Sequence, residues 1–263
     1  MRPLFDYYAK LFCSKRWYKL NRILYLLSLR GMGILYYHST KESGEYSFIK
    51  GLNIKDAKSK FIVFDVGANE GDYSLTIKKI YPSAQIYAFE PHPITFKRLK
   101  VASDTYGFQA YNYGLGIKGG QQVLYDHQAD DTGTQHASIY KGVIEEFHNS
   151  KAQKFNVNIC TLDHFIKDNN INKVNLLKID TEGNELNVLH GATISLKNNI
   201  IDMIHFEFNG LNVISRVFMK DFFTLLPNYR FYRMLSDGLI SLEYDYLMCE
   251  IFAFQNIVAI RTS

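Results

Sequence analysis

The chain is poor in proline, glycine and cysteine, and each shortage excludes a class of protein. Its 263 residues include 5 Pro and 17 Gly, too few for a collagen-like or low-complexity chain. Aromatic residues make up 15% of the sequence, which excludes a disordered composition. The three cysteines, Cys13, Cys160 and Cys249, lie far apart and form no C-x-x-C pair. We therefore expect neither a zinc finger nor a disulfide framework. The same pattern favours a protein of a reducing compartment.

Long apolar runs are also missing. No run approaches the roughly 18 residues that a membrane-spanning helix needs. The most apolar N-terminal stretch, residues 23–29, is bracketed by Arg22 and Arg30, and a secretion signal needs a longer uncharged stretch and a small-residue cleavage site. The length fits one large domain, or one domain with a short extension. We expect a soluble, cytoplasmic protein.

Residues 1–60 are expected to form a basic, helical N-terminal extension. Four apolar residues recur there at helical spacing: Trp17, Leu20, Leu24 and Leu27. Residues 1–30 hold seven Lys or Arg against one acid, Asp6, whereas the rest of the chain holds 23 basic and 25 acidic residues. Two interpretations stay open. The extension packs its apolar stripe on the main domain, or it docks on a partner or an anionic membrane surface, which would place the protein at the inner face of a membrane.

Residues 61–263 have the pattern of an α/β domain, in which short apolar runs alternate with helical stretches. The strands are expected at 61–66, 85–90, 108–114, 121–127, 155–162, 175–180, 201–208, 229–235 and 251–260. The helices are expected at about 72–80, 93–102, 184–197 and 215–226. No helix is expected between the last two strands, which suggests an antiparallel hairpin at the sheet edge. The polar stretch 126–142 predicts a long loop, and such loops in compact domains are usually functional or disordered. Its expected place above the carboxyl ends of the strands favours a role around the substrate.

A glycine-containing turn after the first strand carries the strongest chemical signal. Its spacing, Gly67-x-x-x-Gly71, differs from the G-x-G-x-x-G that cradles a dinucleotide pyrophosphate. Asp65 precedes the turn and would repel a pyrophosphate, but it suits a ligand with a cationic amino-acid part. Glu90 ends the second strand, where it can accept hydrogen bonds from both hydroxyls of a ribose. A nucleoside that bears an amino acid in place of phosphates describes S-adenosylmethionine.

At this point the sequence resembles the FkbM-type methyltransferase family. The resemblance rests on FDVGANEGDYS (64–74), YAFEPHP (87–93), TLDHF (161–165), LLKIDTEGNELNVLHGA (176–192) and IHFEFN (204–209). It implies a Rossmann-like class I S-adenosylmethionine-dependent methyltransferase fold, with a mostly parallel seven-stranded sheet and an antiparallel edge hairpin. It also implies methyl transfer to an oxygen of a sugar, glycan or natural product, often in polysaccharide biosynthesis.

The resemblance assigns cofactor-binding roles residue by residue. It places the methionine part in a loop made of Asp65, Gly67, Ala68, Asn69 and Gly71. Tyr73 and Ser74 begin the next helix and can donate to the methionine carboxylate, because helix N-termini favour anions. Glu90 matches the ribose-binding acid, and Pro91 shapes the turn after it. Asn112 either contacts the adenine edge or serves in turn formation.

Methyl transfer to a sugar hydroxyl benefits from a general base, or from a metal that lowers the hydroxyl pKa. The candidates at the carboxyl ends of the strands are Asp180, Glu182 and Glu207, with His136 in the polar loop. Three converging carboxylates would also suit a divalent cation, but no spacing requires one and no metal site is predicted. His205 lies inside an apolar strand and is interpreted as a satisfied buried histidine. Asp130 and Asp131 are interpreted as a solvated turn.

Other functions fit the sequence less well. A nicotinamide-dependent oxidoreductase conflicts with the turn spacing and with Asp65. A nucleic-acid methyltransferase predicts a basic stripe interleaved with aromatics, whereas the expected site is acidic, so no nucleic-acid partner is expected. A non-catalytic binding module would not need the intact cofactor motif. Lipid-linked, polyketide or peptide acceptors remain alternatives to a sugar, and the sequence does not determine the oligomeric state.

Overall fold

The computed structural model describes residues 2–35, 42–52, 61–128 and 136–262. The helices are α1 (Arg2–Phe12), α2 (Tyr18–Gly31), α3 (Glu45–Lys50), α4 (Asp72–Ile80), α5 (Pro93–Tyr106), α6 (Leu162–Asp168), α7 (Glu185–His190), α8 (Thr193–Lys197), α9 (Leu211–Ser215), α10 (Met219–Leu225) and α11 (Tyr246–Cys249), with a short π-helix η1 (Val143–Phe147). The strands are β1 (Ile62–Val66), β2 (Gln85–Phe89), β3 (Gln109–Tyr111), β4 (Gly114–Leu115), β5 (Gly120–His127), β6 (Ala152–Cys160), β7 (Leu176–Ile179), β8 (Met203–Phe208), β9 (Tyr229–Leu235), β10 (Gly238–Leu242) and β11 (Gln255–Arg261).

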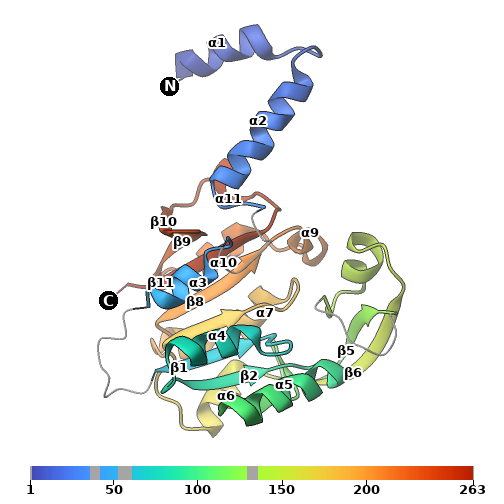
Figure 1. Ribbon diagram of the computed structural model, residues 1–263, viewed down its shortest axis with the longest axis vertical. Helices are drawn as coiled ribbons and strands as arrows, with labels where there is room; N and C mark the ends of the chain where they lie inside the picture. The colour runs from blue at the N-terminus through green and yellow to red at the C-terminus, as the bar shows by residue number, and fades with distance from the viewer. Residues whose placement is uncertain (1, 36–41, 53–60, 129–135, 263) are drawn as a thin grey trace.

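An eight-stranded sheet forms the centre of the described chain, in the order β10-β9-β11-β8-β7-β1-β2-β3 (Figure 1). The pairings from β3 to β8 are parallel. Those from β8 through β11 and β9 to β10 are antiparallel. The expected Rossmann-like fold, mostly parallel with an antiparallel edge, is confirmed.

The sheet differs from the expected seven strands at its antiparallel edge. The chain turns back after β9 and adds β10 as an outermost strand. The two last expected strands, β9 and β11, do pair antiparallel. β11 also pairs with β8, so it lies inside the sheet and not at its edge. The stretch 238–242 escaped prediction because its exposed edge position demands little apolar patterning. The helix expected over 184–197 is also divided, since α7 ends at His190 and α8 begins at Thr193.

A second, three-stranded sheet, β4-β6-β5, stands beside the main one and forms a small lobe with η1 (Figure 1). The expected strands 121–127 and 155–162 correspond to its long antiparallel pair. The expected loop 126–142 overlaps the end of β5 and precedes η1, and its residues 129–135 lie outside the described residues. Asp130 and Asp131 lie outside the described residues.

Helices cover both faces of the main sheet, and strand alternation decides which side chains meet which layer. On one face, Phe64 and Phe89 pack with Phe165 of α6 and Leu189 of α7. On the other, Val63 and Leu176 pack with Phe48 and Ile49 of α3 and with Ile77 of α4. Helix α3 therefore contributes to the core, although it lies within the expected 1–60 extension. The boundary at residue 60 stays a prediction.

Helices α1 and α2 project away from the rest of the chain (Figure 1). Leu29, near the end of α2, is the one buried residue that these two helices show in their described side chains. None of the helices in the described ranges is long and apolar enough to cross a membrane.

Gly67 is expected to be indispensable where β1 and β7 end side by side. Its φ is +81°, and a Cβ there would lie 1.7 Å from the carbonyl oxygen of Asp180. We expect Gly67→Ala to lower the free energy of unfolding by roughly 3 kcal/mol, through backbone strain and steric overlap. Thermal or denaturant unfolding measures this loss. Gly31→Ala is the control, since no atom lies within 4 Å of its Cβ position and its φ is not positive; equal stability of the two variants would contradict the expectation.

Candidate active site

A cavity of about 830 Å³ opens at the carboxyl ends of β1, β2, β7 and β8. This is a size typical of small-molecule sites. Eleven of the predicted site residues line it: Asp65, Gly67, Ala68, Asn69, Tyr73, Glu90, Pro91, His136, Asp180, Glu182 and Glu207. Gly71, Ser74 and Asn112 are not among its lining residues. Sequence motifs that are far apart in the chain therefore meet in one cavity.

The β1–α4 turn is tied to the end of β2 through its backbone N–H groups. The N–H groups of Gly67 and Ala68 both donate to the carbonyl of Phe89 at 2.9 Å, and the N–H of Asn69 donates to Glu90 Oε2 at 3.0 Å. Gly71, at φ +99°, precedes α4, and no side chain caps that helix N-terminus. The first turn of α4 thus offers backbone donors beside the cavity, as an anionic group requires.

Two carboxylates near this turn are strongly buried. Asp65 is 1% exposed and accepts a 2.6 Å hydrogen bond from Ser74 Oγ, so Ser74 orients Asp65. Glu90 Oε1 accepts a further hydrogen bond from the N–H of His92 at 2.8 Å. Burial raises the pKa of Asp65 to about 6 and that of Glu90 to about 7.

Asn112 holds the turn that follows β2. Its side-chain nitrogen donates to the carbonyls of Glu90 at 2.9 Å and Pro91 at 3.2 Å. Asn112 thus serves in turn formation, which is one of the two roles expected from the sequence. A contact with adenine stays a prediction.

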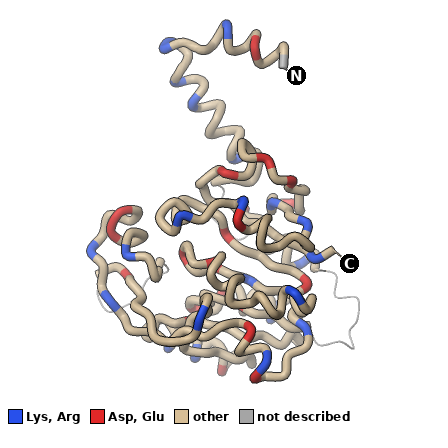
Figure 2. The backbone as a smooth tube through the Cα atoms, turned by 180° about the vertical axis from the view of Figure 1, so that it is seen from behind, with Lys and Arg blue, Asp and Glu red and all other residues tan. Residues whose placement is uncertain are grey.

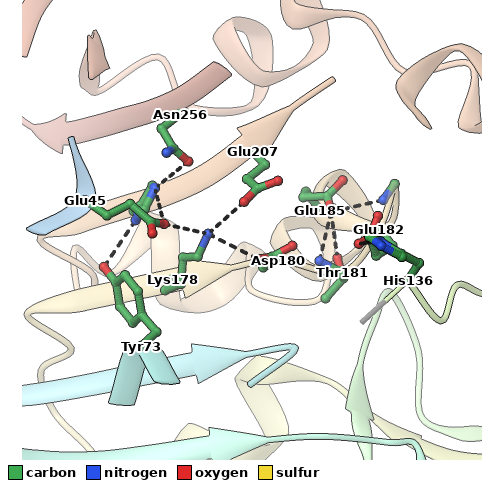
Figure 3. Close-up of polar contacts among 12 residues, drawn as sticks. Glu45, Tyr73, His136, Lys178, Asp180, Thr181, Glu182, Glu185, Glu207 and Asn256 are labelled. Atoms are coloured by element: carbon green, nitrogen blue, oxygen red, sulfur yellow. Dashed lines mark hydrogen bonds and ion pairs between the residues drawn. The ribbon is translucent and has the colours of Figure 1, made fainter. Parts of the chain in front are cut away.

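Lys178 lies at the centre of an acidic cluster that we call the Lys178 cluster (Figure 3). Its Nζ lies 3.5 Å from Asp180, 3.6 Å from Glu207 and 3.6 Å from Glu45. Lys178 and Asp180 share the face of β7 that is turned toward α3, which brings Glu45 into reach. Three carboxylates therefore surround one buried ammonium.

The charges of this cluster are interdependent. Burial by itself would lower the pKa of Lys178, but Asp180, Glu207 and Glu45 outweigh it and hold that pKa well above its usual value. Burial raises the pKa of Glu45 and Glu207, and the charge of Lys178 opposes the rise. No group of His, Cys, Asp or Glu within the described residues is arranged to hold a metal ion. Asp180 and Glu207 face the ammonium of Lys178, whereas Glu182 faces His136.

His205 lies behind the Lys178 cluster and is fully buried. Its Nδ1 lies 3.1 Å from the hydroxyl of Tyr73 and its Nε2 lies 3.0 Å from Asn256 Oδ1. Burial lowers its pKa well below the usual value, and Lys178 lowers it further. The interpretation of His205 as a satisfied buried histidine is confirmed.

Glu182 forms a pair with His136 at the side of the cavity, with Oε1 at 3.3 Å from Nδ1 (Figure 3). Its hydrogen bond to Glu182 raises the pKa of His136. Glu182 adopts a φ of +52°, and Glu185 fixes the turn around it. Glu185 Oε1 accepts from the N–H groups of Thr181 at 2.9 Å and Gly183 at 3.1 Å.

Two more histidines accompany His136 on the small lobe. The ring centre of His148 lies 4.7 Å from that of His136 and 5.1 Å from that of His127. His148 lines the cavity, and the buried Nε2 atoms of His127 and His148 have no hydrogen-bond partner within the described chain. His148 thus adds a second imidazole beside His136 to this side of the cavity, whereas His127 is not among the lining residues.

Several residues of the site were not predicted from the sequence. Lys178 and Glu185 are part of the block 176–192, and a charged residue inside the apolar run LLKI was a usable signal for Lys178. Glu45 carried no signal, because tertiary packing of α3 brings it to the site. His127 and His148 likewise meet His136 only in the folded lobe.

Comparisons with known proteins match the part of the chain that contains most of the cavity residues. A family model described as the methyltransferase FkbM domain matches residues 65–233. "Methyltransferase 1" of Beauveria bassiana is 33% identical over 152 residues, which cover 50% of this chain and 57% of that protein. The hexuronic acid methyltransferase AglP of Haloferax volcanii is 28% identical over 166 residues, 62% of this chain and 63% of that protein. The chain therefore spans less than two thirds of the length of these curated relatives.

Among solved structures, the plantazolicin methyltransferase BpumL in complex with SAH matches 97% of this chain and 93% of its own chain. The sequence identity is 9% and the TM-score is 0.44.

Removing the central ammonium tests the Lys178 cluster. We expect Lys178→Met to cost about 3–5 kcal/mol of stability at pH 8, because it leaves buried carboxylates without a cation. The loss should shrink toward pH 5. Glu45 and Glu207 have raised pKa values, so they take up protons there and shed the uncompensated charge.

Denaturant unfolding at both pH values measures this effect. Lys173→Met is the matched control, since Lys173 is 59% exposed and its ion pair with Asp202 should contribute at most about 1 kcal/mol. A loss for Lys178→Met that does not depend on pH would contradict the electrostatic account.

Proposed function

Because the chain belongs to the FkbM methyltransferase family, we propose that it transfers a methyl group from S-adenosylmethionine to a hydroxyl of a sugar or glycan. The observation that carries the proposal is the single cavity, which joins the β1–α4 turn and Glu90 on one side to His136 and Glu182 on the other. One side suits the cofactor, and the other suits an acceptor that must lose a proton.

The charges and hydrogen-bonding groups around the β1–α4 turn fit the cofactor. Glu90 presents a carboxylate for the ribose hydroxyls, and the uncapped N-terminus of α4 presents donors for the methionine carboxylate. Asp65 and the Lys178 cluster give this region more carboxylates than cations, which suits a positively charged ligand. When bound, S-adenosylmethionine supplies an electrophilic methyl group on a cationic sulfur.

His136 is the residue best suited to take the acceptor proton. When the acceptor oxygen takes the methyl group from the cofactor, the hydroxyl proton would pass to His136 Nε2. Nδ1 faces Glu182, which stabilises the protonated ring and fixes its orientation. Asp180 and Glu207 face Lys178 and line the same cavity, where they can orient acceptor hydroxyls.

A sugar acceptor is favoured by the polar surface of the small lobe. His136, His148 and Glu182 line this part of the cavity and suit a ligand rich in oxygen atoms, whereas an apolar polyketide would bring no hydrogen-bonding groups to them. The relative from Haloferax volcanii is named for a hexuronic acid, which combines hydroxyls with a carboxylate. We extend that class of acceptor to this chain as part of the proposal.

Cofactor binding is the first test. Calorimetry should detect S-adenosylmethionine binding, and Asp65→Asn and Glu90→Gln should each weaken it about 10- to 100-fold through loss of a charged acceptor. Affinity should also rise from pH 6 to pH 8, because the pKa of Glu90 is about 7 and the ionised form is the better acceptor.

Asp104→Asn, on the exposed surface of α5, is the control and should leave affinity unchanged. If the wild-type chain bound a nicotinamide dinucleotide and no S-adenosylmethionine, the oxidoreductase alternative would replace the proposal.

Turnover is the second test. Incubation with labelled cofactor and uronate-containing oligosaccharides, followed by mass spectrometry, should show methylated product. His136→Gln and Glu182→Gln should lower kcat by about 100-fold or more while cofactor affinity stays unchanged. In Glu182→Gln, the rise of residual activity with pH should shift to lower pH, since Glu182 raises the pKa of His136.

The chemistry of the product separates two kinds of oxygen acceptor. A methyl ether resists mild alkali, whereas a methyl ester on a uronate carboxylate is hydrolysed. An alkali-labile product, or full activity of both variants, would overturn the role of His136 as general base. Parallel reactions with and without a chelator decide whether a divalent cation takes part.

A further inference from the structure

Helices α1 and α2 expose two rows of large apolar side chains. In α1 the row is Leu4, Tyr7, Tyr8 and Leu11, and in α2 it is Leu20, Ile23, Leu24 and Leu27. Both rows follow the spacing i, i+3, i+4, i+7, so each occupies one helix face. These side chains are between 41% and 67% exposed. An apolar surface of this kind marks an interaction site.

The same helices are strongly basic. Six Lys or Arg with described side chains belong to this segment: Lys10, Lys15, Arg16, Lys19, Arg22 and Arg30. The only acidic residue in 2–31 is Asp6. Figure 2 shows mainly blue segments along the two helices, against intermixed blue and red on the body of the molecule. The surface is therefore both apolar and cationic.

The two helices form one braced unit. Tyr8 donates a 2.6 Å hydrogen bond to Asn21 Oδ1, and Asn21 Nδ2 donates to the carbonyl of Phe12 at 3.1 Å. The ring of Phe12 packs edge-on against Trp17, with centres 5.2 Å apart. The corner between α1 and α2 is thus fixed by side-chain contacts, and both apolar rows are presented by a defined shape.

Charge decides what covers this surface. A second copy of the chain would bring two cationic surfaces together, and repulsion would oppose their apolar contact. An anionic lipid surface satisfies both features, since basic side chains meet headgroups while apolar rows enter the acyl boundary. With 11 and 14 residues, the helices are too short to span a bilayer but suited to lie in its surface.

We propose that α1 and α2 form a membrane-surface anchor for anionic lipids. The anchor joins the cavity directly. The segment after α2 reaches Leu35, whose N–H donates to the carbonyl of Phe254 at 2.8 Å, and both residues line the cavity. Membrane binding at α1 and α2 would therefore hold the domain that carries the cavity at the membrane. The anchor does not depend on the proposed transfer reaction.

Vesicle co-sedimentation of the full chain tests the anchor. We expect binding to phosphatidylcholine vesicles that contain phosphatidylglycerol, little binding to phosphatidylcholine alone, and loss of binding at high salt. Neutralising three basic residues together, by Lys15→Gln, Lys19→Gln and Arg22→Gln, should weaken binding about 100-fold, at about 1 kcal/mol per charge. Ile23→Ser with Leu27→Ser should also weaken it.

A matched triple variant controls for net charge. Lys118→Gln, Lys151→Gln and Lys154→Gln remove three exposed lysines of the small lobe and should leave vesicle binding unchanged. All variants should keep the melting temperature and the cofactor affinity of the wild-type chain, which separates failure of the anchor from failure of the proposed function.

Two results would overturn the anchor. One is equal sedimentation with and without anionic lipid. The other is an absence of vesicle binding, together with a dimer in light scattering that Ile23→Ser and Leu27→Ser dissociate, which would assign the surface to a second copy of the chain.

Discussion

The buried ammonium of Lys178 is the interaction on which the site depends. Asp180 follows β7, Glu207 lies on β8 and Glu45 on α3, and the ammonium offsets the repulsion between their carboxylates. The cluster therefore fixes how α3 packs against the sheet while it shapes the acidic wall of the cavity. Stability and site electrostatics are set by the same four side chains, so neither can change without the other.

The side of the cavity formed by the β1–α4 turn is organised on a different principle, since most of its hydrogen bonds are donated by backbone N–H groups. Gly67 lets the ends of β1 and β7 approach at a distance that no other residue permits. Asn69 and His92 use their N–H groups to hold Glu90, and Ser74 holds Asp65. These contacts fix two buried carboxylates before any ligand arrives, which lowers the cost of ordering them on binding.

Much of this was predictable from sequence, because the features that were predicted correctly are local. The turn from Asp65 to Gly71, and its place between a buried strand and a helix, follow from neighbouring residues. Strand β10 was missed because an exposed edge strand carries little patterning, and the break between α7 and α8 was missed for lack of a proline or a long loop. Glu45 and the contact of His136 with His148 depend on packing between distant segments. Sequence periodicity contains no information about such contacts.

Glu45 precedes the first residue of the region that matches the family, which runs from 65 to 233. One of the three carboxylates around Lys178 is therefore supplied by a segment that the family does not define. A change in that segment would alter the balance of charge in the cavity wall while it left every matched motif intact. The cavity therefore depends on residues outside the matched region, and a chimaera that transplants only residues 65–233 would inherit an incomplete acidic wall.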